Sequence, residues 1–334
     1  MHPNIPVMIS GVYRSGTTFV NAAISCFEGY SSLSSGLKFM RFCFGQYGEK
    51  LKTISQLSDL LEDCRLRLAY RWNIKISVKK ILSQVIERGI SYSAVYDLIM
   101  RDILDLNDKK ISQQWCDKLV LGWNDIEKFL ELFSHGVVIH IIRNPLDVLQ
   151  SYKSKTTEPH PVYLDAIFNC YSSFLFAKNI PQKWRDRIIV CKAEEFFESN
   201  SDIYKKLSSI LNSKFNKNKF ESAKFSTLID QWDTNSENVE LISIGKKLHT
   251  INSYSNFTEL ESYLLETLCG SYMDEFAFTR DYKPRHLSQS KVEEILNYKY
   301  LINRYRLSIC GKDPGPSYFT NPIELEWKIV NEKK

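Results

Sequence analysis

Short apolar runs alternate along the chain with longer segments of mixed polarity. A continuous run of about four to eight apolar residues is typical of a strand buried on both faces of a parallel sheet. The pattern predicts such strands at residues 7–11, 118–123, 137–142 and 188–192. It predicts helices over residues 17–27, 124–133, 163–178, 203–211, 260–268 and 288–306, and one that begins at Pro145 and includes Ser151. Strands that alternate with helices indicate an α/β fold with a doubly wound parallel sheet.

Between the first helix and the second strand the pattern changes. From about residue 40 to 117, Leu and Ile recur at three- and four-residue spacing, which predicts several amphipathic helices. We expect this helical insertion, 40–117, either to cap a ligand site or to be plain core packing. Its aromatic residues are expected to stack on a ligand or to pack inside: Tyr70, Trp72, Tyr92 and Tyr96.

Two other segments give little periodic signal. Residues 30–36 are rich in serine and are predicted to form a loop. Residues 213–260 are polar and are predicted to be an irregular, variable region. No repeat or linker divides the chain, so we expect residues 1–334 to form a single α/β domain with the insertion built into it.

Composition and charge limit the class of ligand. The 334 residues are 43% apolar and 13% aromatic, enough for a large core. The net charge of +5 is mild and fits a small anionic ligand better than a nucleic acid, whose binders concentrate charge in one patch. The Lys-rich stretch 205–224 is interpreted as a solvated face.

The cysteines and histidines suggest neither disulfides nor a metal site. Eight cysteines are scattered without a C-x-x-C pair, which predicts buried thiols in a reducing compartment. The six histidines form no metal-ligand spacing, so no metal is expected. No signal sequence precedes the first strand, and the longest aliphatic run, 136–142, is too short to span a membrane. We therefore expect a cytoplasmic protein.

The first strand leads into a glycine-bounded loop. Gly11 and Gly16 have the spacing of the phosphate-binding motif G-x-x-x-x-G-K-[ST], but Thr17 replaces its lysine. The cation is Arg14, inside the loop. Ser15 and Thr18 add hydroxyl donors beside the N–H groups of the helix start. Unless the loop is an ordinary glycine turn, it should bind a terminal phosphate without hydrolysing a nucleoside triphosphate.

A second cation follows the strand at 137–142. Arg143 stands at the end of this strand, where ligands of open α/β sheets bind. Pro145 begins the next helix, and Ser151 lies on it eight residues after Arg143. Arg143 is therefore either part of a second anion site with Ser151 or a helix-capping arginine.

Taken together, the segments at Gly11–Thr18 and Arg143–Ser151 resemble the two cofactor-binding motifs of the sulfotransferase family. Trp115-Cys116-Asp117-Lys118 resembles a segment that precedes the second motif in carbohydrate and tyrosylprotein members. Residues 190–196, a strand followed by paired acids, are similar to a structural element of the family. The resemblance extends over about residues 5–200.

The resemblance implies a P-loop-like fold and a donor, 3′-phosphoadenosine-5′-phosphosulfate (PAPS). Its 5′ end would be held by Arg14, Ser15, Gly16, Thr17 and Thr18, and its 3′-phosphate by Arg143 and Ser151. A sulfuryl group would move in line to an acceptor hydroxyl or amine, without a metal. Arg14 and Lys118 are the catalytic candidates, although Lys118 could be a surface lysine at a strand start. By analogy the acceptor would be a carbohydrate or glycoconjugate, bound under the insertion.

The catalytic base does not carry over. Members commonly place a glutamate about twenty residues after the loop cation, but residues 34–38 hold no carboxylate. Other members use a histidine in the strand before the second motif, and residues 119–123 hold none. His140 is expected to be buried, and Glu49, Asp125 and His135 are open candidates.

Two other functions fit part of the pattern. The first is a nucleotide or small-molecule kinase with a degenerate P-loop, which would leave Arg143 and Ser151 without a role. The second is a catalytically inactive, nucleotide-binding interaction protein, which the missing base motif would suit.

Overall fold

Five parallel strands form one sheet at the centre of the molecule. The computed structural model describes residues 5–33, 37–104, 114–155, 160–222, 257–312 and 315. The strand order is β2-β3-β1-β4-β5. The strands are β1 (Val7–Gly11), β2 (Tyr30–Ser32), β3 (Gln114–Val120), β4 (Val137–Ile142) and β5 (Ile188–Lys192). β2 and β3 lie on one side of β1, and β4 and β5 lie on the other, as expected for a doubly wound sheet. The predicted α/β class is therefore confirmed.

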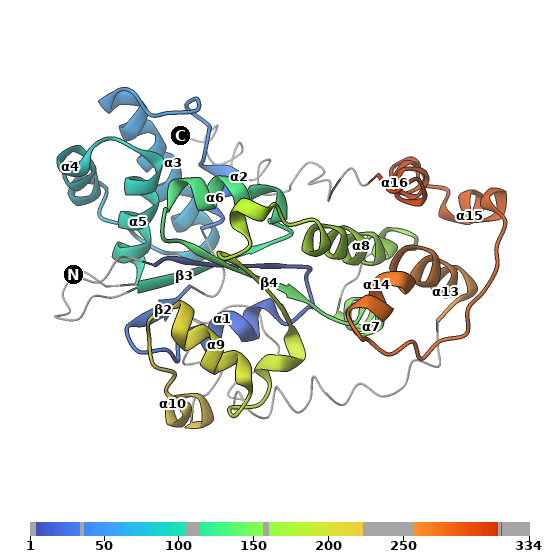
Figure 1. Cartoon of the computed structure of the whole chain (residues 1–334). Helices are drawn as coiled ribbons and strands as arrows, with labels where there is room; N and C mark the ends of the chain where they lie inside the picture. The colour runs from blue at the N-terminus through green and yellow to red at the C-terminus, as the bar shows by residue number, and fades with distance from the viewer. Residues whose placement is uncertain are drawn as a thin grey trace.

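Helices cover both faces of this sheet (Figure 1). One face carries α1 (Thr17–Ile24), α9 (Asp202–Ile210) and α10 (Lys217–Ser222), which share a buried core with β1, β4 and β5. A second, larger core lies on the other face. Its helices are α2 (Phe39–Phe42), α3 (Ile54–Trp72), α4 (Val78–Arg88), α5 (Tyr92–Ile103), α6 (Ile126–Leu132), α7 (Pro145–Lys155) and α8 (Asp165–Lys178).

The C-terminal helices extend this second core beside α7 and α8 (Figure 1). They are α13 (Glu259–Leu264), α14 (Gly270–Glu275), α15 (Gln289–Leu296) and α16 (Lys299–Ile309), with a π-helical stretch, Leu265–Cys269, between the first two. Arg304 of α16 is fully buried and donates to Asp165 Oδ1 of α8 at 2.6 Å and to Asn169 Oδ1 at 2.9 Å. This buried arginine joins the C-terminal helices to the sheet domain.

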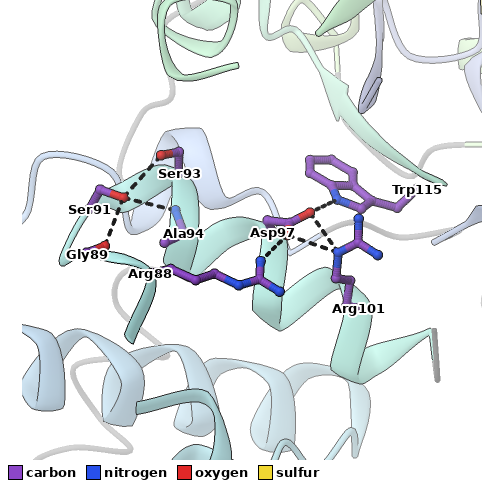
Figure 2. Close-up of polar contacts among 8 residues, drawn as sticks. All are labelled: Arg88, Gly89, Ser91, Ser93, Ala94, Asp97, Arg101 and Trp115. Atoms are coloured by element: carbon purple, nitrogen blue, oxygen red, sulfur yellow. Dashed lines mark hydrogen bonds and ion pairs between the residues drawn. The ribbon is translucent and has the colours of Figure 1, made fainter. Parts of the chain in front are cut away.

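A buried carboxylate of the insertion, Asp97, gathers hydrogen bonds from two of its helices and from the sheet. Asp97 of α5 accepts hydrogen bonds from Arg88 Nη1 at 2.9 Å, from Arg101 Nε at 2.9 Å and from Trp115 Nε1 of β3 at 2.8 Å (Figure 2). Its side chain is buried, and a charged acceptor in a dry setting makes strong hydrogen bonds. Asp97 therefore fixes α4 and α5 against β3.

Replacing this carboxylate should destabilise the protein measurably. We expect Asp97→Ala to lower the free energy of unfolding by about 2 kcal/mol, because three donors, among them the fully buried indole of Trp115, lose a charged acceptor. Urea unfolding followed by circular dichroism would measure the change. The control is Asp59→Ala, which changes an exposed residue of α3 and should alter the free energy of unfolding by less than about 0.5 kcal/mol. Equal stability of the two variants would contradict this account.

Two strand predictions were wrong in detail. Residues 30–32 form the edge strand β2 and not a loop; three residues with two serines carry almost no apolar signal. The strand predicted at 118–123 begins earlier, at Gln114, and ends at Val120. Two charged residues of this strand, Asp117 and Lys118, interrupt the apolar run that would have predicted its start. The left-handed backbone of Leu121 (φ 55°) ends the strand.

Helix predictions were correct in place but not always in extent. The helix predicted at 288–306 is two helices, since Asn297 adopts a left-handed backbone (φ 33°) that ends α15. The helix predicted at 260–268 continues through a π-helical stretch into α14. The helices of the insertion lie within residues 39–103, and β3 takes residues 114–117. Of the region predicted to be irregular, 213–260, residues 223–256 lie outside the described residues. Its described part is not wholly irregular, because it contains α10 and the start of α13.

The insertion's aromatic residues pack inside the protein where the structure describes them. Tyr92 is 3% exposed and Tyr96 1%, and the Tyr96 ring stacks on Phe39 at 4.5 Å. These two were expected either to stack on a ligand or to pack, and packing is correct. The side chains of Tyr70 and Trp72 lie outside the described residues. The predicted thiols are confirmed, with all eight cysteines free and seven of them buried.

Candidate functional site

The loop between β1 and α1 has the backbone of an anion-binding turn. Gly11 has φ +150°, and a Cβ there would stand 2.6 Å from the carbonyl oxygen of Ile141, so only glycine fits. Gly16 is left-handed (φ 85°) and begins α1. A helix start leaves its first N–H groups without intrahelical partners, and its dipole favours a negative charge. The predicted strand–loop–helix geometry is therefore present.

Arg14 is exposed in this loop, and its side chain contacts the last residue of the second predicted motif. Its Nε donates to Ser151 Oγ of α7 at 3.0 Å, and its backbone is left-handed (φ 64°). Tyr13 also stacks on Tyr152 of α7, with ring centroids 5.6 Å apart. Two residues separated by 137 positions thus meet at one point, as the two-motif prediction requires.

Arg143 lies behind this contact, at the end of β4. Its Nη1 donates to the carbonyl oxygen of Arg14 at 2.9 Å. Although Arg14 is exposed as a residue, the protein around its guanidinium partly removes that group from water. This desolvation, and next the charge of Arg143, lower the pKa of the Arg14 guanidinium. Two neighbouring cations of this kind favour an anion between or beside them.

Two carboxylates surround Arg143, whose side chain is only 1% exposed. Asp147 Oδ2 lies 3.5 Å from Nη2, and Glu194 Oε1 lies 4.0 Å from Nε. Burial raises the pKa of Glu194, an effect that the charge of Arg143 opposes. Sequence reasoning assigned neither acid to the site. Asp147, in the first turn of α7, had a signal in its place four residues after Arg143, whereas Glu194 was noted only as one of the paired acids that follow β5.

Lys118 projects from β3 toward the start of α1. Its Nζ donates to Thr18 Oγ1 at 2.7 Å, and the residue is half-buried. Burial lowers its pKa to about 8, although the nearby Asp117 carboxylate opposes this shift. The alternative of a surface lysine at a strand start does not fit, because Lys118 lies within β3, opposite Ile9.

The structure thus brings the predicted site residues together along one edge of the sheet. They come from the loop after β1, from β3 and from the β4–α7 junction, and they are Arg14, Ser15, Gly16, Thr17, Thr18, Lys118, Arg143 and Ser151. Asn144 links a further segment to this edge, since its Nδ2 donates to the Thr279 carbonyl at 3.1 Å. Which ligand atoms each residue contacts stays a prediction.

The four candidates for a base have different surroundings. Asp125 follows the carboxyl end of β3, and burial raises its pKa while Arg41 opposes the shift. His135 precedes β4 and therefore stands at the opposite edge of the sheet. Glu49 is exposed in the loop before α3. His140 is fully buried, as expected, with Nε2 2.9 Å from Ser173 Oγ.

His140 should make the protein sensitive to acid. Burial lowers its pKa to about 4, so between that value and the ordinary pKa of about 6.5 the unfolded chain binds a proton that the folded chain does not. The free energy of unfolding therefore decreases as the pH falls through this window, by about 2 kcal/mol between pH 7 and 4.5. We expect His140→Gln to lose this part of the pH dependence in urea unfolding. The exposed His135→Gln should keep it, and equal slopes in both variants would contradict the assignment.

The described residues contain neither a group of metal ligands nor a helix that could span a membrane. Within the described ranges, no group of three or more histidine, cysteine or acidic side chains is placed to hold a metal ion. In the same part of the chain, every helix is too short or too polar to cross a membrane.

Comparisons with known proteins agree on one family. The model of the sulfotransferase family matches residues 6–188. A comparison with curated protein sequences found no match. Among solved structures, the sulfotransferase domain of an olefin synthase from Synechococcus PCC 7002 is similar with a TM-score of 0.54 and 15% identity, over 84% of this chain and 96% of that one.

Two further structures are less similar. The sulfotransferase domain from the curacin biosynthetic pathway has a TM-score of 0.48 and 14% identity, over 83% of this chain and 99% of that one. Sulfotransferase STF9 from Mycobacterium avium has a TM-score of 0.41 and 13% identity, over 85% of this chain and 79% of that one. The similarity to the olefin synthase domain supports the fold of this chain. Since the family model covers more than half of the chain, the protein belongs to the sulfotransferase family of enzymes.

Proposed function

We propose that this sulfotransferase uses PAPS as its donor. The observation that carries the proposal is the contact of Arg14 with both Ser151 and Arg143. A donor with separate 5′ and 3′ anionic groups needs two adjoining cationic sites, and the neighbouring guanidinium groups of Arg14 and Arg143 support this assignment. The described residues fit this donor, because the glycine loop admits a close backbone approach and the helix start supplies N–H groups.

In the proposed reaction the protein acts mainly by positioning and by neutralising charge. The bound donor supplies the activated sulfuryl group. Ser15, Gly16, Thr17 and Thr18 hold its 5′ end, and Arg143 and Ser151 hold its 3′-phosphate. Arg14 and the Lys118 ammonium, which contacts Thr18, would stabilise the negative charge that develops on the leaving oxygen. Preorganised donors of this kind need no rearrangement during the transfer.

We further propose a carbohydrate or glycoconjugate hydroxyl as the acceptor. This choice is an analogy with the carbohydrate and tyrosylprotein members, whose segment before the second motif resembles residues 115–118. The helices of the insertion adjoin the end of β3, where Arg41 Nη2 donates to the Val120 carbonyl at 2.6 Å, so they can border an acceptor. The acceptor-binding cap remains part of the proposal.

Two measurements test the donor and the reaction. Calorimetry should detect tighter binding of adenosine 3′,5′-bisphosphate than of ATP with Mg²⁺; tighter ATP binding would favour the kinase alternative and refute the donor assignment. Transfer of ³⁵S from labelled PAPS should then be followed with panels of glycans, lipids and phenols. Sulfation of glycans supports the acceptor class, whereas sulfation of phenols alone would refute it. Donor binding without transfer to any panel would indicate the inactive binding protein.

We also propose a reducing compartment, the cytoplasm, as the place of action. The free thiols support it, because a compartment that forms disulfides would act on such a set. Fractionation of cells that produce the tagged protein would test this, and recovery from an oxidising compartment would contradict it.

A further inference from the structure

Asp117 is a buried carboxylate next to Lys118 that the reaction described so far does not use. It is 1% exposed and lies on β3, one residue before the lysine. Neighbouring residues of a strand point to opposite faces, so the Asp117 side chain faces the insertion while Lys118 faces α1. The hydrogen bonds of the two side chains agree with this arrangement.

Both oxygens of Asp117 have defined partners. Oδ1 accepts the backbone N–H of Lys118 at 2.7 Å. Oδ2 accepts the hydroxyl of Tyr96, which belongs to α5 of the insertion and is itself fully buried. A carboxylate that is taken out of water in this way is costly unless charges or donors compensate it.

The charged groups around this carboxylate come from several elements. Burial raises the pKa of Asp117 to about 6, and the Tyr96 hydroxyl, the Lys118 N–H, the Lys118 ammonium and Lys38 before α2 oppose the shift. Cys116, the preceding residue of β3, lies on the α1 side, where its thiol contacts Asn21. Burial raises the pKa of this thiol, and the Asp117 charge raises it further. Lys118 has its pKa lowered to about 8 by burial, and Asp117 is the group that opposes this. Between these two values both side chains are charged.

We propose that Asp117 is a positioning residue for Lys118: it fixes the backbone at the lysine and keeps the side chain in the ammonium form. Tyr96 supports this by donating to the ionised carboxylate, which ties the charge of Lys118 to the packing of α5. The functional meaning rests on the proposed role of Lys118 in transfer, but the electrostatic coupling does not.

The coupling can be measured in the unmodified protein by NMR. With ¹³Cε-labelled lysine, the Lys118 signal, assigned with Lys118→Arg, should titrate near pH 8 and show a second, smaller inflection near pH 6, where Asp117 titrates. A single inflection would overturn the proposal. This measurement requires no activity, so it can succeed even if the proposed transfer reaction fails.

Variants separate charge from structure. Asp117→Asn should lower the Lys118 pKa by about one unit and shift the alkaline limb of the kcat profile by the same amount. At pH 8, kcat should then fall about fivefold, whereas at pH 6 it should equal that of the unmodified enzyme. Tyr96→Phe keeps the carboxylate and should change kcat at pH 8 less than about twofold. Asp102→Asn on the same helix is the control and should change neither. Similar losses in Asp117→Asn and Tyr96→Phe at every pH, with an unchanged Lys118 pKa, would overturn the proposal.

Discussion

Alanine at position 143 is expected to weaken binding of adenosine 3′,5′-bisphosphate by at least about 100-fold. Arg143 supports the Arg14 carbonyl and is the proposed 3′-phosphate cation, so its loss removes one charge-assisted contact to the ligand and one support of the loop. Each hydrogen bond to a charged group contributes about 1.5–3 kcal/mol, and two of them account for the factor. The same variant should unfold at a lower temperature, since Asp147 and Glu194 lose a buried counter-ion. Calorimetry and thermal unfolding would measure both effects.

The control for this prediction distinguishes geometry from charge. Arg143→Lys keeps one positive charge but lacks the planar fork that contacts the Arg14 carbonyl and faces the two acids. We expect it to recover stability more than affinity. Lys205→Ala removes a lysine of α9 whose side chain is 80% exposed, and it should change neither stability nor affinity. Undiminished ligand affinity in both Arg143 variants would show that the second anion site is assigned wrongly.

The central strands were predictable because burial on both faces leaves a continuous apolar run. β4 and β5 occur at the predicted residues, 137–142 and 188–192. β3 was displaced in the prediction because it carries Asp117 and Lys118, whose charges are compensated by Tyr96 and Thr18 from distant helices. A strand that contains site residues departs from the apolar pattern for a functional reason, and periodicity alone cannot show the compensation.

For the site, the sequence located the residues but not their supports. The loop glycines, Arg14 and the start of α7 have local signals, and the structure brings them together. Glu194 and Asn144–Thr279 meet the site through contacts that span about 50 to 135 positions, which local patterns do not contain. The neighbours of Arg14, Arg143 and Lys118 orient these side chains, and they shift the pKa of Arg14 and of Lys118, so the electrostatics of the site required the fold.

Lys118→Met is expected to lower kcat by about 100- to 1,000-fold while the affinity for adenosine 3′,5′-bisphosphate changes less than about tenfold. The proposed role of Lys118 is to stabilise charge that develops during transfer, and removing one such donor typically has an effect of this size. In the unmodified enzyme, kcat should fall as the pH rises through about 8, since the ammonium is then lost. Lys118→Arg should retain part of the activity and move this limb to higher pH, because a guanidinium stays protonated.

Lys118→Met should gain stability while it loses activity. Misfolding would lower both, so it could not produce this result. Burial lowers the pKa of Lys118 from its ordinary 10.5 to about 8, so keeping this lysine charged at neutral pH costs folding free energy. Lys118→Met removes that cost and should raise the free energy of unfolding by about 1 kcal/mol at pH 7, part of the gain being offset at Asp117. Lys128→Met, with a side chain 53% exposed, should alter neither kcat nor stability. A stabilised but inactive Lys118 variant would identify a residue retained for the reaction, whereas a destabilised or fully active one would contradict that role.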